Sequence, residues 1–138
     1  MNKFLKSARR LALGVLHKAL WPIHFYRVKR VLHKGCQPSK SLLNSLVYHW
    51  GNVGFSADAL YLELIVREAL IRRDLKILEC GTGLSTLLLG LVAEVRGHQI
   101  IALEHDSEWC GRVRRRLRAA RIESADIILC PLKDYGEF

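Results

Sequence analysis

From residue 57 onward, short apolar runs alternate with longer segments whose apolar positions recur every three or four residues. The short runs predict strands and the spaced positions predict helices. The predicted order is helix 57–72, strand 75–79, helix 84–96, strand 99–104, helix 107–120 and strand 126–130. Alternation at this spacing is typical of a parallel sheet with right-handed crossovers. We therefore expect an α/β fold, a Rossmann-like parallel sheet of about three strands.

Residues at the ends of these segments support the helix boundaries. Gly97 follows the second helix, as a C-terminal glycine does. Ser56 suits the N-cap of the first helix, and Asp106 or Ser107 suits that of the third. The apolar residues that we expect on the buried side of the first helix are Leu60, Leu64, Ala69 and Leu70.

The first part of the chain has a different pattern. Apolar residues recur at helical spacing between residues 4 and 20, and we expect Trp21-Pro22 to stop this helix or bend it. Ser39 is expected to cap a short helix that continues to about Trp50. We therefore divide the chain into a helical extension at 1–55 and a partial Rossmann-like domain at 56–138.

Charge separates the same two parts. Residues 1–57 hold ten Lys or Arg and no acid, whereas the rest of the chain sums to −1, so the whole excess of +9 lies in the N-terminal part. Three interpretations remain open for it: a helix packed on its own domain with a solvated basic face, a peripheral membrane contact through residues 3–34, or a nucleic-acid contact. Nucleic acid is the least favoured, and we expect the arginine-rich face of helix 107–120 to be solvated.

The apolar runs and the cysteines give an expectation of where in the cell the protein is found. No apolar run approaches 18 residues, so no membrane-spanning helix is indicated. The four cysteines form no CxxC pair, and their separations suit no zinc site, so no metal site is predicted. We expect reduced, buried thiols in a cytoplasmic protein, with membrane association as the alternative. The side chain of Cys80 is expected to point into the sheet.

The stretch 75–86, LKILECGTGLST, carries the strongest functional signal. Glycines between a strand and a helix let the backbone approach a ligand closely, and the helix directs free N–H groups toward it. Glu79 stands two residues before the first glycine. Its carboxylate would repel a pyrophosphate but favour an ammonium or hydroxyl groups. S-adenosylmethionine carries both, so it fits better than NAD.

The second strand adds an acid at the expected distance. Glu104 ends this strand 21 residues after Gly83, where a carboxylate can accept hydrogen bonds from ribose hydroxyls. With Glu79-Cys80-Gly81-Thr82-Gly83 as first motif and Leu103-Glu104-His105-Asp106 as second, the chain resembles the class I S-adenosylmethionine-dependent methyltransferases from about Ser56 to Tyr135.

The resemblance implies roles for individual residues. Glu79, Gly81 and Gly83 would hold the methionine end of S-adenosylmethionine, and Glu104 would hold the ribose. His105 is interpreted as an edge residue near the adenine. The candidate cofactor-binding residues are Glu79, Cys80, Gly81, Thr82, Gly83, Ser85, Glu104 and His105.

Other positions around this site have weaker assignments. The family often places an aspartate near the adenine just after the third strand, but here Cys130-Pro131-Leu132 offers none and Asp134 comes late. Trp50 and Asn52 could edge the pocket, although packing residues are the favoured interpretation for both. No catalytic residue is assigned, and the methyl acceptor is unknown.

Two alternatives to a working methyltransferase stay open. Three strands are fewer than the seven that the family fold implies, which is consistent with a non-catalytic remnant or a partner-dependent binding module. A partner chain completing the sheet is expected, because part of a parallel sheet exposes an edge and an apolar face. The other alternative is an NAD-binding oxidoreductase fragment, but Thr86 replaces the third glycine of its usual motif.

Overall fold

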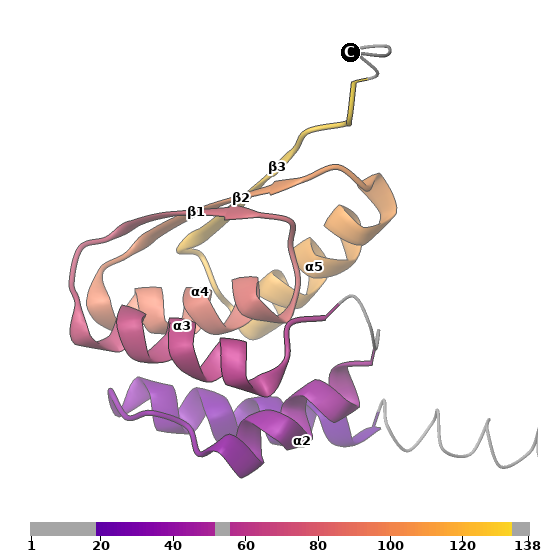
Figure 1. The fold of residues 1–138 in the computed structure, drawn as a ribbon. Helices are drawn as coiled ribbons and strands as arrows, with labels where there is room; N and C mark the ends of the chain where they lie inside the picture. The colour runs from indigo at the N-terminus through magenta and orange to yellow at the C-terminus, as the bar shows by residue number, and fades with distance from the viewer. Residues whose placement is uncertain (1–18, 52–55, 134–138) are drawn as a thin grey trace, which may run out of the picture.

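A computed structural model describes residues 19–51 and 56–133 of the chain (Figure 1). The described part begins with an N-terminal helix over residues 19–33. The other elements are α2 (Lys40–Trp50), α3 (Ala59–Ile71), β1 (Lys76–Cys80), α4 (Leu84–Arg96), β2 (Gln99–Glu104), α5 (Ser107–Ala120) and β3 (Ala125–Leu129). Each predicted strand and helix from residue 57 onward is present, and no bound differs by more than two residues.

The three strands form one parallel sheet in the order β1-β2-β3. Cys80 pairs with Leu103, and Glu104 pairs with Leu129, so the carboxyl ends of all three strands meet at one edge. The prediction of a Rossmann-like α/β fold with a parallel sheet of three strands is confirmed.

The helices lie in layers on one side of the sheet. Figure 1 shows α3, α4 and α5 beneath the strands, with α2 and the N-terminal helix as a further layer below. Right-handed crossovers explain this placement, because two successive crossovers in the same direction put α4 and α5 on the same face. The other face carries exposed apolar side chains: Leu78, Ile101 and Ile128 are 66%, 45% and 44% exposed.

Helix α4 lies at the centre of the core. Its buried residues run almost without interruption from Leu84 to Ala93, because the sheet covers one side and α3 the other. Gly90 allows the closest approach: a Cβ at this position would lie 2.6 Å from Cγ2 of Ile122, just before β3. The glycine thus lets the chain before β3 pack directly on the helix.

Helix α3 differs from its prediction in cap and in buried side. Asp58, not Ser56, is the N-cap, and its carboxylate accepts a hydrogen bond from the backbone N–H of Tyr61 at 2.7 Å. Leu60 and Leu64 are exposed rather than buried. The buried stripe consists instead of Ala59, Leu62, Val66, Ala69 and Leu70. This stripe has regular helical spacing, and α2 and α4 pack on α3, whereas no described element covers Leu60 or Leu64.

The N-terminal helix continues through Trp21-Pro22, so these residues do not stop it, and the predicted bend stays a prediction. Its Phe25, Val28 and Leu32 are buried in the same core as Leu43 and Leu46 of α2. The apolar stripe predicted at 4–20 lies outside the described residues except for its last two positions. No described helix is both long and apolar enough to cross a bilayer. The membrane contact predicted for residues 3–34 stays a prediction.

The cysteines do not match the expectation of buried thiols. All four are free, but only Cys110 is buried, and Cys36, Cys80 and Cys130 are exposed. Cys80 lies on the sheet face that no described helix covers, because the alternation along β1 turns its neighbour Glu79 toward the helices. The expectation that Cys80 points into the sheet is therefore wrong.

Candidate functional site

Two cavities lie at the carboxyl ends of β1 and β2. The turn cavity, of about 410 Å³, is lined by Trp50, Ser56, Ala57, the stretch 81–85, the stretch 104–106 and Trp109. The edge cavity, of about 780 Å³, lies between α3 and the free edge of β1, and Glu79, Cys80 and Tyr61 contribute to its wall. Gly81, Thr82 and Ser85 line both cavities. The structure thus brings all eight candidate residues to this one edge of the sheet.

The two glycines of the turn have different reasons to be glycine. Gly81 has a φ of +91°, a conformation that other residues adopt only with strain, and its N–H donates to the carbonyl of Leu103 at 2.7 Å. Gly83 has a φ of 173°, which any residue can adopt, and a Cβ there would meet no atom within 4 Å. The backbone conformation at position 81 favours glycine, whereas a glycine at position 83 leaves open space at the start of α4.

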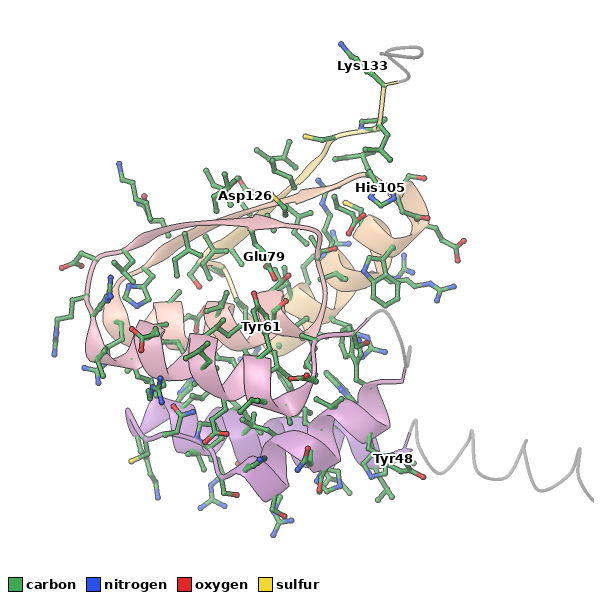
Figure 2. All side chains as sticks on the ribbon, in the orientation of Figure 1. Tyr48, Tyr61, Glu79, His105, Asp126 and Lys133 are labelled. Atoms are coloured by element: carbon green, nitrogen blue, oxygen red, sulfur yellow. The ribbon has the colours of Figure 1, made fainter. Side chains whose placement is uncertain are left out.

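Glu79 sits between the sheet and the first turn of α4 (Figure 2). Its two carboxylate oxygens accept hydrogen bonds from the hydroxyls of Ser85 and Thr86, the latter at 2.7 Å. Burial raises the pKa of Glu79 above its usual value, and the two hydroxyl donors offset part of that rise. The carboxylate therefore lies where the N-terminus of α4 would otherwise attract a phosphate.

Thr86 takes the place of the third glycine of a dinucleotide motif and is fully buried. Its hydroxyl donates to Glu79 and accepts from the N–H of Gly83 at 3.0 Å. The Thr86 hydroxyl thus connects the carboxylate of Glu79 to the backbone of Gly83 in the turn.

Glu104 is buried at the end of β2, with 4% of its side chain exposed. One oxygen accepts from the N–H and the hydroxyl of Thr82 at 3.0 and 2.7 Å. The other oxygen accepts from the backbone N–H groups of His105 and Asp106 at 2.8 and 3.0 Å. Burial alone would raise the pKa of Glu104, but these four donors together hold it below its usual value.

His105 leaves the strand end toward solvent, and its side chain is 60% exposed (Figure 2). Its Nδ1 lies 3.3 Å from the Glu104 carboxylate, so the ring stands at the mouth of the turn cavity. Asp106, the next residue, caps α5 by accepting from the N–H of Trp109 at 2.8 Å. Of the two caps that the sequence allowed, Asp106 is the one used.

Trp109 is a wall residue that the sequence interpretation missed. Its indole Nε1 donates to the carbonyl of Thr82 at 2.7 Å, and its ring meets that of Trp50 edge-on at 6.1 Å between centroids. Its position in the first turn of α5, three residues after the cap, is the signal that could have identified it. Trp50, considered as a pocket edge, does line the turn cavity, whereas Asn52 and Asp134 lie outside the described residues.

The arrangement suits a ligand with positive charge and hydroxyl groups. Two carboxylates flank the glycine turn, one at each strand end, so a phosphate at the turn would meet two negative groups instead of the usual free N–H groups. Within residues 19–51 and 56–133, no cluster of three His, Cys, Asp or Glu side chains could hold a metal ion.

No family model and no curated protein sequence matches the chain. Solved structures do show similar folds. A protein-L-isoaspartate O-methyltransferase aligns over 78% of this chain and 42% of its own, with 13% identity and a TM-score of 0.49. MtNAS in complex with MTA and tNA aligns over 86% of this chain and 44% of its own, with 17% identity and a TM-score of 0.46.

A third similar structure is coclaurine N-methyltransferase bound to N-methylheliamine and SAH. It aligns over 94% of this chain and 43% of its own, with 17% identity and a TM-score of 0.42. Two of these three proteins are named as methyltransferases. All three TM-scores are below 0.5 and the alignments cover less than half of each protein, so the function proposed below rests on the geometry of the site.

Proposed function

We propose that this chain is the cofactor-binding part of a class I S-adenosylmethionine-dependent methyltransferase, with an acceptor still to be identified. One observation carries the proposal: Glu79, the glycine turn and Glu104 line adjoining cavities at the carboxyl ends of two neighbouring parallel strands. Ligands of open parallel sheets bind at this edge. Cavities of about 410 and 780 Å³ fall within the range of small-molecule sites.

The residues present fit the two polar ends of S-adenosylmethionine. The half-buried Glu79 carboxylate would gain from an ammonium group, and Gly81, Gly83 and Ser85 would surround the methionine end. The open space at Gly83 is what a ligand backing onto the turn requires. Glu104 would hold the ribose, and His105 would border the adenine.

The chemistry divides between cofactor and protein. The bound cofactor would supply the methyl group, and the chain would hold and orient it beside an acceptor. The residues of this site bind and position, and none of them is assigned to a proton transfer.

Glu104 favours a second candidate, a non-catalytic module with the same fold. Each of its two oxygens accepts two hydrogen bonds from protein groups, and these are sufficient for a purely structural role. In a binding role it would exchange the Thr82 hydroxyl for a ribose hydroxyl. Under the second candidate the turn cavity holds no cofactor.

A titration calorimetry experiment on the 138-residue chain separates these candidates. S-adenosylhomocysteine is the probe and NAD is the control. Saturable binding of S-adenosylhomocysteine alone, weakened in Glu79→Gln and in Gly83→Ser, supports the methyltransferase proposal. Tighter binding of NAD would move the assignment to a dinucleotide, and no binding by a folded chain would favour the non-catalytic module.

A further inference from the structure

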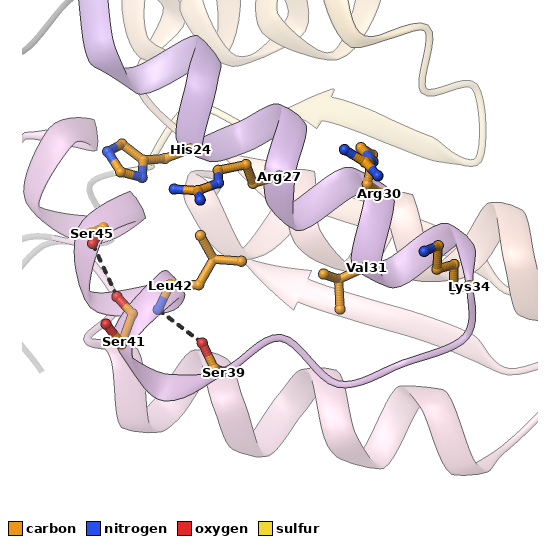
Figure 3. A pocket seen from close by; sticks show the side chains of 9 residues that line it. All are labelled: His24, Arg27, Arg30, Val31, Lys34, Ser39, Ser41, Leu42 and Ser45. Carbon is orange, nitrogen blue, oxygen red and sulfur yellow. Dashed lines mark hydrogen bonds between the residues drawn. The ribbon is translucent and has the colours of Figure 1, made fainter.

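A second cavity region lies far from the glycine turn, on the outer helix layer. This basic groove, of about 420 Å³, runs between the N-terminal helix and the beginning of α2 (Figure 3). Arg27 and Arg30 come from the helix, Lys34 comes from the turn directly after it, and Ser41 and Ser45 come from α2 on the other side. Nothing in the proposed methyl transfer uses these residues.

The three cations lie along one side of the helix and the turn that follows it, and no acid lines the groove beside them. Their spacing of three and four residues places them along a single stripe. None of the three forms a salt bridge with any residue that the structure describes. Lys29 on the same helix differs, because its Nζ donates to the carbonyl of Ala120 at 2.7 Å. The stripe thus holds charges that packing between described elements does not use.

The start of α2 adds positive potential to the same groove. Ser39 caps the helix by accepting from the N–H of Leu42 at 3.3 Å, and the first turn holds no acid. A helix N-terminus carries partial positive charge, which an acid in the first turn commonly balances. Here the hydroxyl of Ser41 lines the groove, and that of Ser45 donates to the Ser41 carbonyl at 3.1 Å. Three cations and a helix N-terminus therefore line one groove that has no acidic side chain in its wall.

We propose that the basic groove binds a phosphate group. Like charges along one groove wall repel one another, and a bound anion would add an attractive interaction with each of them. Guanidinium groups bind phosphate oxygens through paired N–H donors, and serine hydroxyls add further donors. A doubly charged phosphate monoester balances more of the charge of three cations than a singly charged carboxylate does. The phosphate belongs either to a soluble ester or to the headgroup of an anionic lipid.

The test uses the full chain at low ionic strength with two probes. Inorganic phosphate is titrated by calorimetry, and vesicles of phosphatidylcholine with phosphatidic acid are compared with phosphatidylcholine alone by co-sedimentation. The variant Arg27→Gln/Arg30→Gln removes two cations from the groove. Arg73→Gln/Arg118→Gln removes two exposed cations elsewhere and is the control of equal net charge.

A second pair of variants tests the effect of a negative charge inside the groove. Ser41→Asp places a carboxylate in the first turn of α2, where it faces the three cations, and Ser41→Asn is its uncharged control. We expect Ser41→Asp to raise the melting temperature while it weakens phosphate binding. Equal melting temperatures and equal phosphate affinities in Ser41→Asp and Ser41→Asn would contradict the proposal.

The proposal holds if the groove variant weakens binding about tenfold or more while the control variant does not. Binding of free phosphate identifies a soluble ester as the ligand, and binding of phosphatidic acid vesicles alone identifies a lipid headgroup. Equal losses in the two double variants would mean attraction by net charge only and would overturn the proposal. Absence of binding to both probes would overturn it as well.

Discussion

Thr82 donates two hydrogen bonds to a single oxygen of Glu104, one from its backbone N–H and one from its hydroxyl. The glycine turn after β1 is thereby fastened to the end of β2. A ribose hydroxyl that bound to this oxygen would compete with the Thr82 hydroxyl. In the proposed cofactor site, the Thr82 hydroxyl thus occupies an acceptor position of Glu104 that a ligand hydroxyl could use.

The variant Thr82→Val tests this exchange. Valine keeps the shape of threonine but removes the hydroxyl, so we expect a loss of about 1–3 kcal/mol in the free energy of unfolding. If Glu104 binds ribose, one acceptor position is free in advance and S-adenosylhomocysteine binds more tightly than to the original chain. Denaturant unfolding and calorimetry measure the two effects. A lower stability with unchanged affinity would assign Glu104 a structural role only.

Glu104 should make stability depend on acidic pH in a defined direction. Its folded pKa is lowered, so its contribution is present above the unfolded value of about 4.3 and is lost as pH falls through the folded value. We expect the difference in unfolding free energy between the original chain and Glu104→Gln to be largest near neutral pH. This difference should shrink below about pH 4. A difference independent of pH would contradict the assigned hydrogen bonds.

Glu79 should make the free energy of unfolding depend on pH in the opposite direction. Its folded pKa is raised, so the stabilisation it gives is complete below the unfolded value of about 4.3 and is lost as pH rises through the folded value. An ammonium group bound beside it would lower that pKa, so S-adenosylhomocysteine should release protons on binding at weakly acidic pH. Calorimetry in two buffers of different ionisation enthalpy measures the release. Glu79→Gln should show none, and equal release in both chains would place the ammonium elsewhere.

The periodicity of the sequence predicts the fold more fully than it predicts the site. Strands β1, β2 and β3 are recognised because their apolar runs are too short for helices and lie between longer segments with helical spacing. Apolar character predicts that Leu60 and Leu64 lie on the buried side of α3, but both are exposed. Their exposure depends on which neighbours α3 has, and local spacing does not contain that information.

Spacing also identifies the site residues but not their partners. Glu79 and Glu104 could be placed at neighbouring strand ends from the order of elements alone. That Ser85 and Thr86 hold the first acid, and Thr82 the second, depends on the path of the turn. Trp109 enters the wall because α5 starts at Ser107 with Asp106 as its cap, a detail of one or two residues.

Gly83 offers a substitution that separates ligand binding from folding. Serine at this position fits the φ of 173°, meets no atom within 4 Å at Cβ and is a good N-cap for α4. We expect Gly83→Ser to change the free energy of unfolding by no more than about 0.5 kcal/mol but to weaken S-adenosylhomocysteine binding, because its side chain enters the turn cavity. The comparison variant is Gly81→Ser, which should cost about 1 kcal/mol or more through its φ of +91°. Unchanged affinity in Gly83→Ser would show that no ligand backs onto the turn.

Arg116 of α5 joins the predicted extension to the predicted domain. Its guanidinium carbon lies 4.6 Å from the ring centre of Trp21 and 4.1 Å from that of Trp50, so one cation contacts two aromatic rings from the first 55 residues. Burial lowers the pKa of Arg116, and the nearby charge of Arg112 lowers it further, so the rings offset part of an unfavourable charge. The contact is thus one of the links that hold the N-terminal helix and α2 against α5.

The variant Arg116→Lys keeps the charge but loses the planar group that stacks on both rings. We expect it to lower the free energy of unfolding by about 1–2 kcal/mol. Arg115→Lys, an exposed neighbour on the same helix, is the control and should change stability by less than about 0.5 kcal/mol. Thermal unfolding followed by tryptophan fluorescence and by circular dichroism should give one coincident transition in the original chain, because the extension and the sheet share one core. Two separate transitions, with Arg116→Lys moving neither, would mean that the extension folds independently of the parallel sheet.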